Sequence, residues 1–153
     1  MLKRSICVAA FFALLPIESG NAAGNTATSC MDGRTQALRR DGFSGPIICD
    51  PRDSQFRKIG RISSEGHSYL VYDFRYSFKA ANVRHGGQRL LVFSADGRYL
   101  GQYSLSPPPY YEFVIEGTKV NASASGKFVG ALNFHDGPPG FEEVDGYHGE
   151  FFR

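Results

Sequence analysis

The chain has 153 residues, of which 42% are hydrophobic and 21% charged, and its formal net charge is +2. This near balance of charge gives no electrostatic basis for binding nucleic acid or an anionic membrane surface. The length suits one domain with its own hydrophobic core and is short for two domains.

Residues 1–23 have the order of a cleavable secretory signal. Two basic residues precede a short apolar run over residues 6–15, and small residues follow it. The run is about half of the ~20 residues that a transmembrane helix needs, so we expect no retained membrane anchor. Cleavage after Ala22 and cleavage after Ala23 both fit the pattern. The mature chain is therefore expected in the periplasm or outside the cell.

Two cysteines remain once the signal is removed, Cys30 and Cys49. An even pair of cysteines in an oxidising compartment predicts a disulfide. The bridge closes a loop of about 20 residues, for which the chain-entropy model gives on the order of 3 kcal/mol of stability. No CxxC pair and no nearby histidine completes a zinc ligand set with these two thiols.

Residues 24–56 predict a loose leader, one short helix and a brief strand. The helix covers residues 32–40, with Thr35 as a candidate cap and two glycines beyond it to end it. Residues 46–49 are expected to form the strand, which the disulfide ties back to the segment before the helix. From residue 30 onward, this unit belongs to the same domain as residues 57–153.

From residue 57 onward the hydrophobic pattern alternates with a period of two, which is typical of β-strands. Residues 67–78 place apolar and aromatic side chains on one face, which predicts a half-buried strand. Residues 89–93 are apolar on both faces and are expected in the middle of a sheet. The predicted strands are residues 57–63, 67–78, 88–95, 98–106, 110–116, 118–124, 127–134 and 141–152, the last of which can also form two short strands.

Short turn sequences separate these strands. Asp96-Gly97 is the strongest hairpin signal, and Glu-Gly, Ser-Gly and Asp-Gly pairs stand at other breaks. Strands joined in order by tight turns make an antiparallel meander of seven or eight strands. The predicted fold class is therefore mainly β, as a small barrel or a two-sheet sandwich. We favour a closed or nearly closed barrel, because long exposed edges promote aggregation.

Three consecutive prolines at residues 107–109 separate two of the predicted strands. Proline cannot donate to a β-ladder, so this stretch is expected outside the sheet or at its edge, as a stiff connector. Tyr110 and Tyr111 follow it and are candidate binding residues, because tyrosine offers a large contact area at little entropic cost. The stretch also matches the short motif that WW domains bind, but such a partner is not expected for an exported domain.

Residues 82–89 are expected to form a loop or wide turn between two strands. Arg84, His85 and Arg89 are the candidate binding residues here, since loops at the end of a rigid scaffold commonly carry function. The adjacent glycines either let the backbone approach an anion or another chain closely, or simply provide the turn.

Sequence patterns of known enzyme chemistry are absent. There is no GxSxG, no GxGxxG between a strand and a helix, and no GxxxxGK. The adjacent Glu142 and Glu143 point to opposite faces of a strand and cannot pair as acid and base. The four histidines show no HxH or HxxxH spacing, so no metal site and no cofactor is predicted, although His135 and Asp136 can contribute to one if other groups converge on them.

These observations favour a binding module over an enzyme. We expect a periplasmic or secreted protein-binding domain, inhibitor- or immunity-like, that contacts another envelope or extracellular protein through its loops. In architecture alone, an exported disulfide-bearing β-meander of this size resembles the small periplasmic barrels that bind and inhibit enzymes such as lysozymes, and no residue is carried over from that resemblance. The alternative is a small-ligand carrier or small hydrolase with a site at the barrel mouth and His67 or His85 as its polar anchor.

Overall fold

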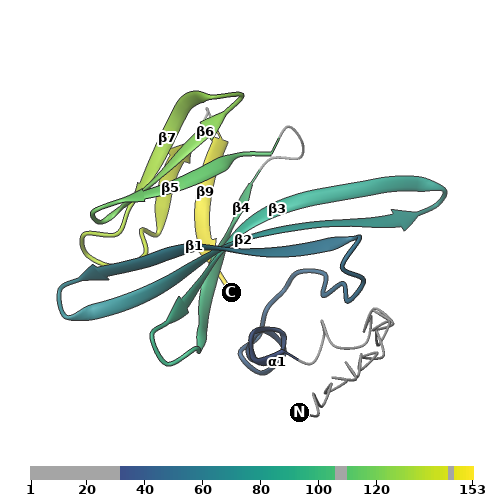
Figure 1. Ribbon diagram of the computed structural model, residues 1–153, viewed down its shortest axis with the longest axis horizontal. Helices are drawn as coiled ribbons and strands as arrows, with labels where there is room; N and C mark the ends of the chain where they lie inside the picture. Colours follow the sequence, from purple (N-terminus) through teal and green to yellow (C-terminus); the bar gives the residue numbers. More distant parts are fainter. Residues whose placement is uncertain (1–31, 106–109, 145–146) are drawn as a thin grey trace, which may run out of the picture.

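The computed structural model describes residues 32–105, 110–144 and 147–153, which form one helix and nine strands (Figure 1). The elements are α1 (Gly33–Arg40), β1 (Ser54–Ser64), β2 (His67–Ala80), β3 (Val83–Ser94), β4 (Tyr99–Leu105), β5 (Glu112–Glu116), β6 (Lys119–Ala124), β7 (Lys127–Asn133), β8 (Phe141–Val144) and β9 (Tyr147–Phe152). The signal sequence, Cys30 and the three prolines lie outside the described residues, so the disulfide and the proline connector stay predictions. Within the described part, no helix is both long and apolar enough to cross a membrane.

The described strands form two antiparallel sheets. In the larger sheet the order is β1-β2-β3-β4-β9-β8, and in the smaller it is β5-β6-β7 (Figure 1). The predicted mainly β class with antiparallel neighbours is confirmed. The predicted closed barrel is wrong, because no ladder joins the two sheets among the described residues and β4 pairs with β9 instead of β5. The prolines between β4 and β5 lack the N–H groups that a continuing ladder needs.

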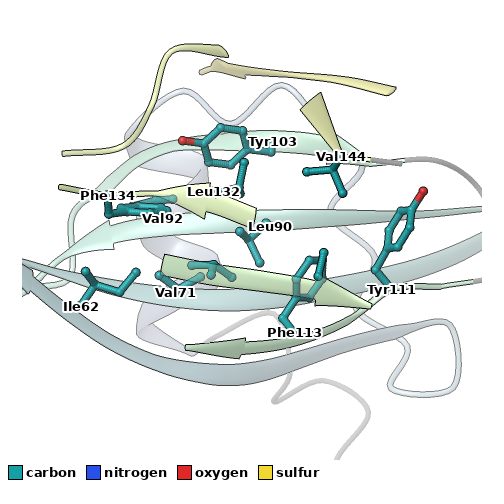
Figure 2. Close-up of a cluster of buried hydrophobic side chains, with 12 residues drawn as sticks. Ile62, Val71, Leu90, Val92, Tyr103, Tyr111, Phe113, Leu132, Phe134 and Val144 are labelled. Carbon is teal, nitrogen blue, oxygen red and sulfur yellow. The ribbon is translucent and has the colours of Figure 1, made fainter. Parts of the chain in front are cut away.

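The main hydrophobic core lies between the two sheets. Its buried side chains are Ile62, Val71, Leu90, Val92, Tyr103, Tyr111, Phe113, Val120, Ala122, Leu132, Phe134 and Val144 (Figure 2). Full burial of one large apolar side chain contributes about 1.5–3 kcal/mol relative to exposure. The contact between the sheets is therefore held mainly by apolar packing.

The opposite face of the larger sheet is covered by α1, whose Ala37 and Leu38 are buried against it. The sheet contributes Tyr72, Phe74, Leu91, Phe93 and Tyr99 to this second cluster. Because successive strand residues point to opposite faces, β3 is buried on both sides, and the prediction for residues 89–93 is confirmed. Residues 71–74 of β2 are also buried on both faces, so the expected half-buried strand is wrong there.

Asp32 caps α1, in place of the predicted Thr35. Its carboxylate accepts a hydrogen bond from the Thr35 N–H at 2.7 Å, whereas the Thr35 side chain is buried in the first turn. At the other end the Asp41 N–H donates to the Ala37 carbonyl. The Asp41 carboxylate accepts from the Tyr99 N–H at 2.9 Å, which ties the end of α1 to β4.

Residues 46–49 do not form the predicted strand. The segment packs Ile47 against the cluster beneath α1. The Ser54 hydroxyl donates to the Ile48 carbonyl at 2.6 Å. A side-chain hydroxyl thus satisfies a backbone group that a ladder would otherwise satisfy.

The tight turns at Glu65-Gly66, Asp96-Gly97, Glu116-Gly117 and Ser125-Gly126 connect successive strands as the sequence predicts. The glycine in each has φ between +61° and +82°, in the left-handed region that glycine enters without strain. The turn predicted at Asp145-Gly146 lies outside the described residues.

Candidate functional site

The loop predicted over residues 82–89 is instead part of a long hairpin. β2 and β3 pair without interruption, and Ala81 and Asn82 alone form the turn, with φ of +48° and +64°. Two positive φ values belong to the turn that matches the twist of a β-hairpin. Residues 78–86, here called the hairpin arm, are all exposed and extend away from α1 and the smaller sheet (Figure 1).

Gly86 and Gly87 lie inside β3, and because they have no side chains they leave room for one tyrosine ring on each face of the hairpin. A Cβ at Gly87 would lie 2.6 Å from the Oη of Tyr76, whose ring crosses it from the neighbouring strand. A Cβ at Gly86 would lie 3.0 Å from the Oη of Tyr110. The glycine pair therefore gives two tyrosine side chains room against the backbone and does not form a turn.

One face of the hairpin carries a row of rings that begins in the core and ends on the arm. The ring of Phe74, buried beneath α1, lies 5.3 Å from that of Tyr76, and Tyr76 lies 6.4 Å from Phe78. Phe78 stacks on His85 across the strands, with centroids 5.3 Å apart. Aromatic pairs contribute about 0.5–1.5 kcal/mol beyond their burial. The row therefore stiffens the arm.

The other face of the arm is cationic. Lys79 and Arg84 stand directly opposite each other in the β2–β3 register, which is unfavourable for like charges. Asp53 relieves this repulsion by forming an ion pair with Arg84, which also donates to the Ser77 hydroxyl at 2.9 Å. Residues 76–88 contain no Asp or Glu. Charge compensation thus comes from outside the hairpin.

A hollow of about 420 Å³ lies beside the base of the arm. It is lined by residues 51–55, residues 75–77 and Tyr110. Tyr110 is half-buried, and the Arg75 guanidinium stands 5.1 Å from its ring centroid. The lining of the hollow combines hydroxyl, amide and charged groups with the rings of Tyr76 and Tyr110, and is more polar than that of most small-molecule sites.

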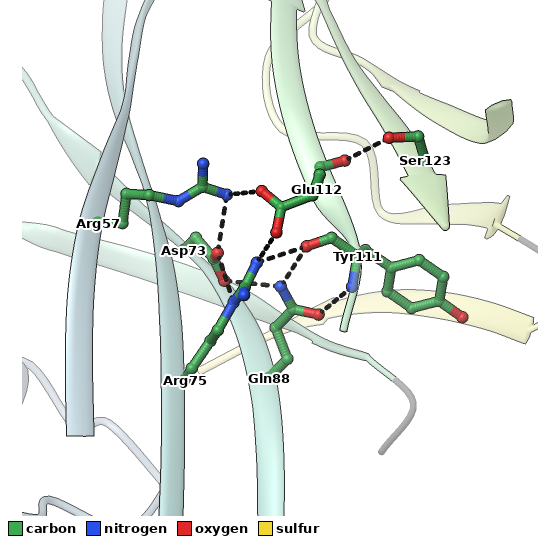
Figure 3. A network of polar contacts seen from close by, with 7 residues as sticks. All are labelled: Arg57, Asp73, Arg75, Gln88, Tyr111, Glu112 and Ser123. Carbon is green, nitrogen blue, oxygen red and sulfur yellow. Dashed lines mark hydrogen bonds and ion pairs between the residues drawn. The ribbon is translucent and has the colours of Figure 1, made fainter. Parts of the chain in front are cut away.

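A network of charged and amide groups lies next to this hollow, with Asp73 at its centre (Figure 3). The Asp73 side chain has no exposed area. Its carboxylate accepts hydrogen bonds from Arg57 at 3.1 Å, Arg75 at 2.9 Å and Gln88 at 2.8 Å. Both oxygens are occupied by donors and shielded from solvent, which suits a structural ion pair and not an acid–base catalyst.

The same donors hold the segment that leads into β5. The Gln88 amide donates to the Tyr111 carbonyl and accepts from the Tyr111 N–H, both at 2.8 Å. Arg75 donates to that carbonyl and to Glu112, each at 2.8 Å, and Arg57 donates to Glu112 at 2.7 Å. The hydrogen bond from Arg75 lowers the pKa of Glu112, although partial burial opposes the shift. The network joins β1, β2 and β3 to β5 at the base of the arm.

Three of the five predicted binding residues lie together at the hairpin. Arg84 and His85 are exposed on opposite faces of the arm. Tyr110 lies beside them, with its hydroxyl over Gly86. These three residues remain candidate contacts for a partner. Arg84 and His85 lie on β3, where it pairs with β2, and not in the predicted loop, and Tyr110 lies next to them.

The other two predicted residues lie away from the hairpin arm, Tyr111 buried and Arg89 half-buried. Tyr111 is only 3% exposed and belongs to the core between the sheets (Figure 2). The Arg89 guanidinium lies on the α1 side, 5.7 Å from the ring centroid of Phe43, and donates to Gln102 at 2.8 Å. The alternation of Tyr111 with the apolar Phe113 was the sequence signal for its burial.

Sequence reasoning did not single out Phe78, Lys79 and Val83, which are exposed on the arm. The available signal is Asn82, since asparagine tolerates positive φ better than most residues and can form a two-residue turn. Recognition of that turn would have extended both strands and placed these side chains near its end.

A second hollow, of about 600 Å³, lies between the start of α1 and the β3–β4 turn. Arg34 lines it together with Tyr72 and Phe93. The Arg34 guanidinium stands 5.5 Å from the ring centroid of Tyr72 and pairs with Asp32 at 3.1 Å. His67 and His85, the predicted anchors of a small-ligand site, line neither of these two hollows.

No protein-family model, curated protein or solved structure matches the chain. The residues of the chain itself therefore provide the basis for proposing a function. The features that stand out are the exposed arm, the hollow at its base and the polar network beside that hollow.

Proposed function

We propose that the protein is an exported binding module that recognises another protein through the hairpin arm. The observation that carries the proposal is the exposure of residues 78–86 on both faces, with stacked rings on one and cations on the other. Aromatic and arginine side chains supply much of the binding free energy in protein interfaces. Export is inferred from residues 1–23 and restricts the partner to an envelope or extracellular protein.

The arm suits this role because it is held in one conformation before a partner arrives. The row of rings ties it to the core beneath α1, and the ion pair between Arg84 and Asp53 connects it to the segment before β1. Ordering of a flexible surface costs about 0.5–1.5 kcal/mol for each immobilised side chain. A preformed hairpin avoids much of that loss, and it is narrow enough to enter a partner's cleft as an inhibitor or immunity protein does.

The test compares an arm variant with a matched control variant. The arm variant carries Phe78→Ser and Val83→Ser, at side chains that are 41% and 57% exposed. The control carries Val114→Ser and Phe128→Ser, at side chains of the smaller sheet that are 58% and 69% exposed. Val83, Val114 and Phe128 are exposed positions of the kind whose substitution usually changes stability by about 0.5 kcal/mol or less. Phe78→Ser also removes the ring contacts with Tyr76 and His85, at about 0.5–1.5 kcal/mol each. Thermal unfolding of both variants therefore accompanies the test and shows whether each one folds.

Wild type and both variants are immobilised and exposed to cell-envelope and extracellular extracts, and the retained proteins are quantified by mass spectrometry. We expect wild type and control to retain one protein near 1:1 and the arm variant to lose it. Removal of one hot-spot side chain, at about 2 kcal/mol, weakens affinity about 30-fold. Equal retention by the arm and control variants would refute the arm as the binding element.

Small-ligand binding is the second candidate function, and the hollow of about 420 Å³ beside Tyr110 is the observation that favours it. This volume lies within the range of small-molecule sites. Native mass spectrometry of the purified protein distinguishes the two functions. A bound small molecule that is lost in a Tyr110→Ala variant and kept in the arm variant supports the carrier.

A further inference from the structure

Three potential metal ligands from two distant turns converge at the end of the molecule where β1 meets β2. Glu65 lies in the β1–β2 turn, and His135 and Asp136 follow β7. One ligand atom from each of the three side chains lies within 4.8 Å of the other two. Sequence spacing does not predict this cluster, because Glu65 is far from the other two residues along the chain.

One hydrogen bond joins the two turns, and two more hold the segment that follows β7. The Ser64 hydroxyl donates to the His135 carbonyl. The N–H of His135 donates to the Asn133 side chain at 3.2 Å, and the Phe134 N–H donates to the Thr118 carbonyl at 2.8 Å. The two turns therefore meet through a contact that does not involve the charged groups of the cluster.

In the part of the chain that the structure describes, neither carboxylate of this cluster has the arginine partner that several other carboxylates of the protein have. Asp41, Asp73 and Glu112 each pair with arginine. Within the described residues, no lysine or arginine forms an ion pair with Glu65 or Asp136, and the closest contact of Asp136 with a basic side chain is 3.8 Å to the Nε2 of His135. Two neighbouring carboxylates without a cation repel each other. A bound cation would remove that repulsion.

The ligand chemistry selects the kind of cation. One imidazole nitrogen with two carboxylate oxygens suits Zn²⁺ and similar transition metals, whereas Mg²⁺ and Ca²⁺ prefer oxygen ligands alone. Zinc lies about 2.0–2.2 Å from such ligands, which places the ligand atoms about 3.4 Å apart in a tetrahedral site. All three side chains are exposed, so their ends can close by the distance that this requires, up to about 1.4 Å.

We propose that Glu65, His135 and Asp136 form a binding site for a divalent transition metal of the zinc class. Each residue supplies one ligand, and water completes the tetrahedron. Such an ion joins the β1–β2 turn of the larger sheet to the segment that follows β7 of the smaller sheet. The proposed metal therefore links the two sheets, as the network around Asp73 does at the base of the arm.

The test is a calorimetric titration of the untagged protein with ZnCl₂ in the presence of 10 mM MgCl₂. We expect one saturable site with a Zn²⁺-dependent rise in the thermal midpoint, because an ion that binds only the folded state stabilises it. His135→Ala should weaken Zn²⁺ binding at least tenfold, and Glu65→Gln should also weaken it, since even loss of an outer-shell partner costs about 10–100-fold. His85→Ala removes another exposed imidazole and should leave the affinity unchanged.

The metal-free His135→Ala variant should keep the wild-type thermal midpoint, which separates loss of a ligand from loss of the fold. Substitution with Co²⁺ gives a second readout, because the visible absorption of a tetrahedral Co²⁺ complex should vanish in the same variant. Absence of a saturable Zn²⁺ site, or equal Zn²⁺ affinity in wild type and His135→Ala, would overturn the proposal.

Discussion

The ring of Tyr76 lies across the backbone of Gly87 on the neighbouring strand, at a distance that leaves no room for a Cβ. The same ring stands between Phe74 and Phe78 in the row that runs onto the arm. The position of the row therefore depends on a residue that has no side chain.

Gly87→Ala is expected to displace the ring of Tyr76 and to lower the free energy of unfolding by about 1–3 kcal/mol, as overpacking commonly does. Urea unfolding of a double-mutant cycle checks this cause: in a Tyr76→Ala background the same glycine substitution should have little effect. Gly33→Ala is the control, because a Cβ there meets nothing within 4 Å. Additive losses would contradict the proposed contact.

Asp73→Ala removes the centre of the network that joins the two sheets. It leaves the partly buried Arg75 and the buried amide of Gln88 without their shared acceptor, and such losses cost about 3–5 kcal/mol. Asp50→Ala is the comparison, since Asp50 pairs with the exposed Arg52 and surface pairs contribute about 0–1 kcal/mol. Chemical unfolding of both variants measures the difference, and equal losses would show that the network does not hold the sheets together.

Acid should weaken the attachment of α1 to the sheet. The hydrogen bond from Arg40 lowers the pKa of Asp41 from 3.8 to about 2, and the N–H of Tyr99 adds to the shift. A carboxyl whose pKa is lower in the folded state contributes stability above its unfolded pKa, and that contribution is lost as the pH falls through the folded value. As the pH falls from about 4 to about 2, the free energy of unfolding of Asp41→Asn should therefore fall less than that of wild type. If chemical unfolding gives the two proteins parallel changes of stability with pH, Asp41 does not have this role.

Replacement by alanine should lower the free energy of unfolding much more at Tyr111 than at Tyr110. Tyr111→Ala empties part of the core and is expected to cost about 3–5 kcal/mol, as other large aromatic truncations do. Tyr110→Ala removes only a half-buried ring and its contact with Arg75, at about 1 kcal/mol. Thermal unfolding separates the two variants, and a small loss at Tyr111 would contradict its place between the sheets.

Local sequence patterns predicted most strands, because alternation of apolar residues and two-residue turn signals act over short distances. Residues 89–93 illustrate this, since an apolar run on both faces predicted a central strand and β3 is buried on both sides. Pairing between distant segments has no such local signal. The ladder between β4 and β9 and the meeting of Glu65 with His135 both depend on where other strands go.

The hairpin arm was missed for a different reason. Two adjacent glycines are common in turns, and a turn was one of the two roles expected for Gly86-Gly87, beside a close approach of the backbone to an anion or another chain. In the structure these residues instead accommodate the rings of Tyr76 and Tyr110. The actual turn at Ala81-Asn82 contains an alanine with positive φ, which sequence preferences disfavour. The paired strands on either side hold it there, so tertiary structure overrides local preference at this point.

The pairing of β4 with β9 has a consequence for the order in which the chain can fold. β4 pairs with β3 through a short turn. Among the described residues, its other edge is covered by the pairs Gln102↔Phe152 and Tyr103↔Phe151, which come from a strand much later in the sequence. Contacts between such distant segments form late because the intervening chain must first be closed into a loop. Until β9 arrives, β4 is an open edge that other copies can join. The risk of misassembly at this edge therefore ends only when β9 pairs with β4.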